Sequence, residues 1–185
     1  MIDRRHQLAR TAGSPVKFII FTCLSLLAAM ASAQCTYQQN EVDKFTKKKV
    51  ISTKAHASLF GAMVDYIMFR SVDGHCFLDI HSSVDNSFGA VPEGASLLFR
   101  LANDSVVEAT ASSMAIASPA YVGTHIVFFF DATYSMELTA LEQLASTPVV
   151  GMRIYHTDSY SDIDWQKPRK QEKLQRAAQC LLQAL

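Results

Sequence analysis

Short apolar stretches alternate with turn residues along most of the chain, a pattern typical of antiparallel β-structure. Two long stretches, 58–72 and 75–83, are separated by Asp73 and Gly74. A two-residue hairpin turn needs positive φ at both positions, which Asp tolerates and Gly adopts freely. The sequence therefore predicts a β-hairpin at this point of the chain.

The same pattern recurs further along. The stretches 96–102 and 105–112 flank Asn103-Asp104 and predict a second hairpin. The stretch 120–134 predicts one or two more strands, and shorter strands are expected at 48–53 and 87–91.

A third hairpin is predicted around Asp158-Ser159. This turn places opposite charges on one face of the hairpin and apolar pairs on the other. The predicted facing pairs are Arg153 with Asp164, Ile154 with Ile163, and Met152 with Trp165. Asp158, Asp162 and Asp164 could instead offer oxygen ligands to calcium. They lack the spacing and the glycine of an EF-hand loop, so we favour the ion pair.

Two helices are predicted late in the chain. Thr139 and Glu142 have the spacing of a capping box, which predicts a short helix over 139–146. A proline opens 168–184, where apolar residues recur at helical spacing and predict an amphipathic helix packed on a sheet. The predicted fold is mainly β, an antiparallel β-sandwich or curled sheet built from hairpins and closed by this helix.

The first 33 residues have the three parts of a secretory signal. The apolar run over 18–33 ends in Ala31-Ser32-Ala33 and follows a basic leader with Arg4, Arg5, Arg10 and Lys17. We expect a signal peptide over 1–33 and one periplasmic or secreted domain over 34–185. An uncleaved anchor is the alternative, although the run is shorter than the about 20 residues of a membrane span.

Without the leader, acidic residues slightly outnumber basic ones, and no basic stripe is expected to serve nucleic acid or anionic lipid. The local basic cluster at 44–49 is interpreted as a solvated loop before a strand. A membrane association is expected only through an uncleaved signal. An envelope protein is a possible partner.

Three cysteines remain after the leader: Cys35, Cys76 and Cys180. Side chains alternate along a strand, so Cys76 shares the apolar face of Leu78 and Ile80 and is expected in the core. This leaves a predicted disulfide between Cys35 and Cys180, which an oxidising compartment would favour. A Cys35–Cys76 bond is the alternative.

No catalytic or cofactor motif occurs in the sequence, whether H-E-x-x-H, C-x-x-C, G-x-S-x-G or a phosphate-binding glycine loop. Asp79 and His81 share one strand face and could hold an ion if another strand contributed a ligand. Exposed polar residues on a strand face are the simpler interpretation. We therefore predict no catalytic, cofactor-binding or metal-ligating residue.

Several segments resemble a family of uncharacterised exported bacterial proteins. These begin, after a signal, with Cys-x-Tyr-x-x-Asn-Glu-x-Asp-x-Phe-Thr, as does "CTYQQNEVDKFT" from Cys35 onward. "LTALEQLASTPVVGMRIY" at 138–155 and "QCLL" at 179–182 also resemble that family. The resemblance implies a small β-rich exported domain whose ends are joined by Cys35 and Cys180. It implies no catalytic residue and no ligand.

The sequence thus favours a non-enzymatic domain with a binding or accessory role in the cell envelope. A polar-aromatic cluster is the most distinctive surface feature, either a binding site or an N-terminal structural anchor: Asn40, Glu41, Asp43, Phe45 and Thr46. The alternative is a hydrolase or metal-dependent enzyme assembled from dispersed residues. Its candidates are His56, His81, His125, His156, Asp79 and Asp131.

Overall fold

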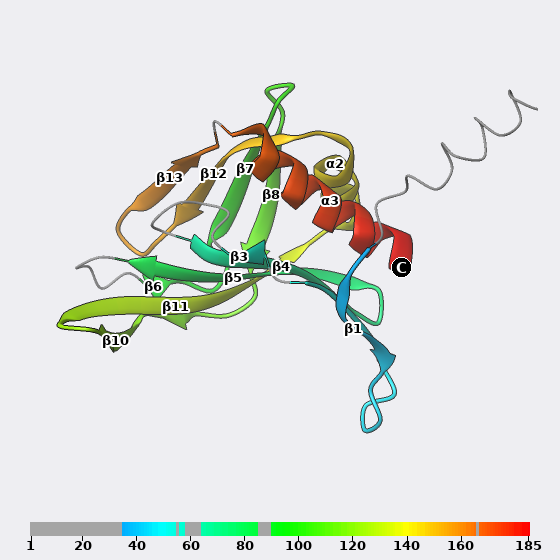
Figure 1. Cartoon of the computed structure of the whole chain (residues 1–185), viewed down its shortest axis with the longest axis horizontal. Helices are drawn as coiled ribbons and strands as arrows, with labels where there is room; N and C mark the ends of the chain where they lie inside the picture. The colour runs from blue at the N-terminus through cyan, green and yellow to red at the C-terminus, as the bar shows by residue number, and fades with distance from the viewer. Residues whose placement is uncertain (1–34, 55, 58–63, 85–89, 166) are drawn as a thin grey trace, which may run out of the picture. The chain divides into compact units, whose positions relative to one another are not determined.

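The structure is a computed structural model that describes residues 35–54, 56–57, 64–84, 90–165 and 167–185 (Figure 1). The chain divides into two units, Met1–Gln34 and Cys35–Leu185, and the description concerns the second. The expected signal peptide and parts of the strands predicted at 58–72 and 87–91 lie outside the described residues. No helix within those residues is long and apolar enough to cross a membrane.

The described residues form a mainly β structure with two helices, as predicted. Eleven strands make one antiparallel sheet, and β6 and β9 pair separately. The order along the sheet is β1 (Tyr37–Val42), β2 (Lys49–Thr53), β4 (Val64–Val72), β5 (His75–Val84), β11 (His125–Met136), β8 (Val106–Ala111), β7 (Ser96–Leu101), β12 (Val149–Tyr155) and β13 (Tyr160–Asp164). The remaining strands are β10 (Ser118–Val122) on β11, β3 (His56–Ala57) on β4, and the pair β6 (Ala90–Val91) and β9 (Ala115–Ile116).

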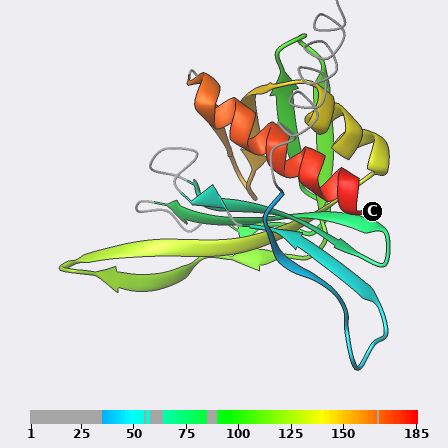
Figure 2. The same ribbon diagram turned by 45° about the vertical axis from the view of Figure 1, so that its right-hand side comes forward.

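The sheet is curled and not closed, and its two halves meet at β11 and β8 (Figures 1 and 2). Only two residue pairs join these strands, Tyr134 with Ala111 and Ser135 with Thr110. The helices α2 (Leu138–Ser146) and α3 (Pro168–Ala184) pack on each other and contact both halves of the sheet. Their apolar faces therefore bury the inner side of the curl in one continuous core.

The first predicted hairpin is confirmed. Asp73 and Gly74 have φ values of 53° and 85°, and the turn joins β4 directly to β5. Cys76, Leu78 and Ile80 are all buried, so the predicted alternation of faces along β5 is confirmed as well.

The third hairpin has a different register from the predicted one. Arg153 pairs with Asp162 rather than Asp164, and Met152 pairs with Ile163 rather than Trp165. The prediction was wrong because the turn has four residues, 156–159, closed by a bond from the His156 amide to the Ser159 carbonyl. A shift of two residues leaves every side chain on its original face, so the separation of charged and apolar faces remains.

Both predicted helices are present, but the capping box at Thr139 is wrong. Helix α2 begins at Leu138, so Thr139 lies inside its first turn. The amides of Ala140 and Leu141 bond to the carbonyl of Glu137, and the Glu137 side chain makes no capping bond to the described structure. Helix α3 has its proline in the first turn, as predicted.

A disulfide joins Cys35 and Cys180, with an S–S distance of 2.10 Å. The alternative pairing is not formed, because Cys76 is a free, buried thiol within the described residues. Beside the disulfide, the Tyr37 hydroxyl donates to the Cys180 carbonyl at 3.0 Å. The Lys49 ammonium donates to the Ala184 carbonyl at 2.8 Å. The β1–β2 hairpin is thus attached to the last turns of α3 at its base, through Cys35 and Tyr37, and beside its loop, through Lys49.

Candidate functional site

The polar-aromatic cluster lies on the β1–β2 hairpin, whose loop end stands clear of the other elements in Figures 1 and 2. Asn40 and Glu41 are exposed on β1. Asp43, Phe45 and Thr46 form the connecting loop. The structure therefore places all five residues on one hairpin, with Asp43, Phe45 and Thr46 in its loop and Asn40 and Glu41 on the strand that leads to the loop.

Asp43 organises this loop. One of its carboxylate oxygens accepts from the Phe45 amide at 3.0 Å, the Thr46 amide at 2.6 Å and the Thr46 hydroxyl at 2.8 Å. Bonds from Thr46 lower the pKa of the Asp43 carboxyl, so it stays ionised. The Lys47 amide also bonds to the Asp43 carbonyl at 2.9 Å. These local bonds hold the loop in one conformation without support from the core.

The ordered loop presents an apolar tip. The Phe45 side chain is 94% exposed and that of Val42 is 57% exposed. Lys47 has φ of 60°, in the left-handed region where a glycine would be unstrained. Backbone strain of this kind costs about 1 kcal/mol or more and concentrates at functional sites. The loop thus keeps a lysine at a position where its backbone is unfavourable.

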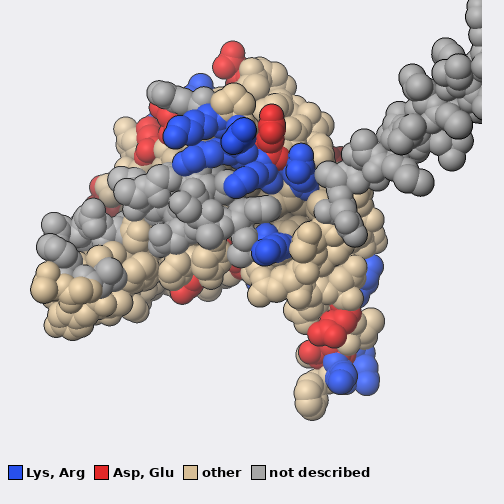
Figure 3. Space-filling model, in the orientation of Figure 1, with Lys and Arg blue, Asp and Glu red and all other residues tan. Residues whose placement is uncertain are grey.

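Lysines surround this tip. Lys44, Lys47, Lys48 and Lys49 are all exposed, and basic side chains are visible at the loop end of the hairpin in Figure 3. Lys49 is partly occupied by its bond to α3. No ion pair within the described part of the chain involves the other three. Their charges are therefore available to a partner.

A second basic region covers the first half of α3. Five basic residues against one acidic residue, Glu172, lie between 167 and 176: Lys167, Arg169, Lys170, Lys173 and Arg176. The first turn of α3 contains no acidic residue. Cations at the positive end of a helix are unfavourable, so this distribution does not serve helix stability. Figure 3 shows these charges over α3, on the face that also shows the basic hairpin end.

Arginines on the sheet are instead paired with carboxylates. Arg70 contacts Asp79 at 2.8 Å, and the same carboxylate accepts from the Thr133 hydroxyl at 2.7 Å. Side-chain bonding to Asp79 raises the pKa of the Arg70 guanidinium. This part of the sheet surface is therefore internally neutralised, unlike the hairpin and α3.

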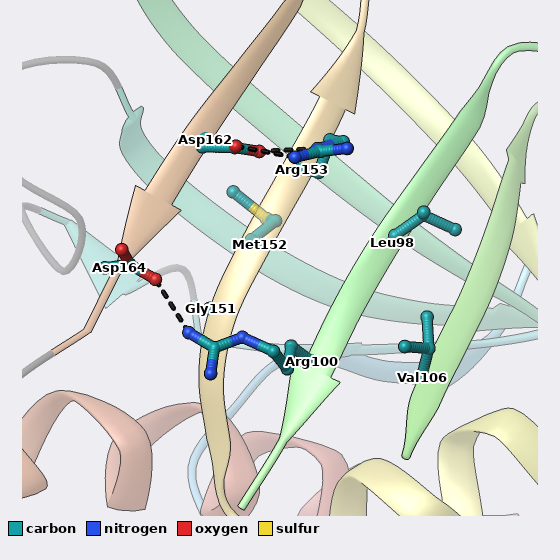
Figure 4. A pocket seen from close by; sticks show the side chains of 8 residues that line it. All are labelled: Leu98, Arg100, Val106, Gly151, Met152, Arg153, Asp162 and Asp164. Carbon is teal, nitrogen blue, oxygen red and sulfur yellow. Dashed lines mark hydrogen bonds and ion pairs between the residues drawn. The ribbon is translucent and has the colours of Figure 1, made fainter. Parts of the chain in front are cut away.

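A shallow depression of about 400 Å³ lies on the outer face of β7, β12 and β13 (Figure 4). Arg100 on β7 reaches across Gly151 on β12 to Asp164 on β13, at 2.9 Å. A Cβ at Gly151 would lie 3.1 Å from the Asp164 carboxylate, so the glycine leaves room for this contact. Arg153 binds Asp162 through two bonds of 2.6 and 2.7 Å.

These ion pairs give the depression a structural role. Arg153 also lies over the Tyr160 ring, 4.0 Å from its centroid, and its bonds to Asp162 lower the pKa of that carboxyl. Each guanidinium in the depression is opposed by a carboxylate. The pair between Arg100 and Asp164 was not predicted, because it depends on the register of three strands.

Two of the six residues named for the enzymatic alternative are in contact. The Nδ1 atom of His81 lies 2.7 Å from Asp131, and Tyr66 and Phe129 stack on the His81 ring with centroid distances of 5.1 and 5.4 Å. Asp79 is bonded to Arg70 and Thr133. The described residues contain no group of three potential metal ligands. The side chains of His56 and His125 lie outside the described part.

His156 is the next histidine named for the enzymatic alternative, and its contacts differ from those of His81. It is half-buried, its Nε2 atom lies 3.0 Å from the Ser161 hydroxyl, and its ring meets Phe130 edge-on. Its Nδ1 atom is buried without a hydrogen-bond partner among the described residues. Burial lowers the pKa of His156 from its ordinary 6.5, because the protonated ring would be poorly solvated.

His156 is expected to make stability depend on pH. As pH falls below the unfolded pKa, the unfolded chain takes up a proton before the folded chain does, so folding stability falls until the lower, folded pKa is reached. We expect His156→Gln to reduce this loss of stability as pH falls below about 6.5. Urea unfolding at a series of pH values measures it. Parallel curves for the two proteins would contradict the assignment.

No protein-family model, no curated protein and no solved structure matches the chain.

Proposed function

We propose that the chain is an exported domain, cleaved after Ala33, that acts by binding in the cell envelope rather than by catalysis. The leader pattern over 1–33 supports export. The disulfide between Cys35 and Cys180 is compatible with an oxidising compartment, where such bonds persist. The loop end of the β1–β2 hairpin is the proposed contact surface.

The exposure of Phe45 on an ordered loop carries this proposal. A phenylalanine ring that is 94% exposed contributes almost nothing to the core of its own chain. The three bonds to Asp43 fix the loop before any partner arrives. Such preorganisation reduces the conformational entropy that the loop loses on binding. An anchoring role would instead require the cluster to bond to the rest of the sheet, whereas these bonds lie inside the hairpin.

The contact between His81 and Asp131 is the observation that favours the enzymatic alternative. Tyr66 on β4 and Phe129 on β11, the strands on either side of β5, both stack on the His81 imidazole, however, and restrict access to it. We therefore interpret Tyr66, His81 and Phe129 as a side-chain ladder that joins three neighbouring strands.

Replacing Phe45 with serine is expected to release the domain from the envelope. In fractionated cells that express the chain, we expect the envelope-bound fraction to fall about ten-fold, since about 1.4 kcal/mol of lost contact corresponds to that factor. The melting temperature should hardly change, because the side chain is exposed. Quantitative immunoblotting of the fractions gives the readout.

Tyr121→Ser is the matched control. Tyr121 is 81% exposed on β10, where no lysine cluster surrounds it. Its loss should leave fractionation unchanged. Equal fractionation of wild type and Phe45→Ser would contradict the proposed role of the hairpin. N-terminal sequencing of the exported product should begin at Gln34, and a retained leader would contradict the cleavage.

A further inference from the structure

We infer that the partner of the hairpin is an anionic phospholipid bilayer, with Phe45 inserted among the headgroups and the neighbouring lysines on lipid phosphates. The inference rests on the proposed function and names the surface that the hairpin contacts. It depends on the combination of an apolar tip, unpaired cations around it, and the basic region of α3.

The tip has the chemistry of a membrane-interface contact. An aromatic side chain can enter the boundary between headgroups and acyl chains while lysines keep their charge at the phosphates. Phe45 and Val42 supply the apolar part, and Lys44, Lys47 and Lys48 supply the charge. Near an anionic membrane, each lysine strengthens binding by about five-fold.

The acidic residues of the hairpin offset only part of this charge. Asp43 directs its accepting oxygen into the loop, toward two amides and a hydroxyl. Glu41 accepts from the Gln39 amide group at 3.1 Å, further along the strand. The lysines outnumber these two carboxylates, and the carboxylate of Asp43 acts within the loop rather than on a partner.

Helix α3 supplies the second region of contact. Its basic residues lie on the face that also shows the basic end of the hairpin (Figure 3). An anionic surface on that side of the molecule would attract both regions. The disulfide attaches the base of the hairpin to α3, and Lys49, beside the loop, bonds to the Ala184 carbonyl, so the two regions keep a defined arrangement. Helix α3 would thereby orient the domain once the tip has inserted.

A bilayer explains the tip better than a soluble polyanion does. A polyanion would be held by the cations alone and would gain little from an aliphatic or phenyl group presented beside them. Here Phe45 is 94% exposed on the loop that carries the lysines, and Val42 beside it on β1 is 57% exposed. Phe45 therefore separates the two kinds of partner experimentally, because only a bilayer should require it.

The experiment is co-sedimentation of the purified exported chain with vesicles. We expect binding to vesicles of phosphatidylglycerol and phosphatidylcholine in equal parts, and little binding to phosphatidylcholine alone. Phe45→Ser should weaken binding about ten-fold, and the triple variant K44Q/K47Q/K48Q about a hundred-fold. Tyr121→Ser should bind like wild type. The pair K170Q/K173Q should weaken binding through α3 by about ten-fold or more.

Each contrary result has a distinct meaning. If wild type does not bind vesicles that contain phosphatidylglycerol, the bilayer inference is wrong. The proposed binding role of the hairpin would still stand if Phe45→Ser lost its association with the envelope. If vesicle binding needs the lysines but not Phe45, and if the chain binds heparin equally well, the partner would be a polyanion instead of a bilayer. Tyr121→Ser with the same loss as Phe45→Ser would overturn the role of the hairpin tip. Circular dichroism checks that each variant is folded.

Discussion

Replacing Cys35 with serine is expected to lower the free energy of unfolding by about 3–5 kcal/mol. The two cysteines are 145 residues apart in sequence, so the disulfide removes many conformations from the unfolded chain. The substitution should also weaken the folded state itself, because the disulfide positions β1 beside α3. Equilibrium urea unfolding of wild type and variant without reductant measures the difference.

Reductant provides the control for this prediction. Dithiothreitol should lower the stability of wild type to that of Cys35→Ser and leave the variant nearly unchanged. Cys76 should not interfere, since burial raises the pKa of its thiol and keeps it protonated while the domain is folded. A variant as stable as oxidised wild type would show that the disulfide does not stabilise the domain.

Substitutions of Tyr134 are expected to act in opposite directions. Tyr134→Ala should lower the free energy of unfolding by about 3–5 kcal/mol, because it leaves a cavity in the core. Tyr134→Phe should be neutral or raise that free energy by up to about 1 kcal/mol. Tyr134 is fully buried, and its hydroxyl has no hydrogen-bond partner among the described residues.

The position of Tyr134 accounts for the size of the alanine effect. It pairs with Leu78 of β5 on one side and with Ala111 of β8 on the other, where the halves of the curled sheet meet. Burial raises the pKa of its phenol, as expected for a hydroxyl without a polar environment. Urea unfolding of both variants tests this account. A large loss in Tyr134→Phe would show that the hydroxyl does have a stabilising partner.

Local rules predicted most of the fold. The Asp73-Gly74 turn followed from backbone preference, and the burial of Cys76 followed from alternation along one strand. Periodicity likewise predicted the apolar face of α3. Each depends on residues close together in the chain, which is why a single sequence could predict them.

Features that depend on turn length or on several strands were missed. Nothing local distinguishes a two-residue turn at Asp158-Ser159 from the four-residue turn over 156–159, so Arg153 was given the wrong partner. The capping box at Thr139 failed because helical bonds already start at the carbonyl of Glu137. Local compatibility permits such alternatives, and tertiary packing selects among them.

The candidate site was also only partly predictable from local sequence rules. The cluster around Phe45 was recognised from its residue types. Its distance from the core, however, depends on how far the hairpin extends beyond the rest of the sheet. The lysines of 44–49 were interpreted as a solvated loop, 168–184 as an amphipathic helix with no role given to its basic residues, and no basic surface was expected for anionic lipid. Only the folded chain presents both on one face.

The disulfide also shows how close the two ends of this unit lie. The Cα atoms of Cys35 and Cys180 are 5.5 Å apart, and Leu185, the last residue of the unit, lies five residues beyond Cys180. A linker of a few residues would bridge the ends of the unit, and the exposed turn at Asn103-Asp104 offers a place to open the chain. The domain is thus well suited to circular permutation, which would reorder its sequence while preserving its hairpin and helix.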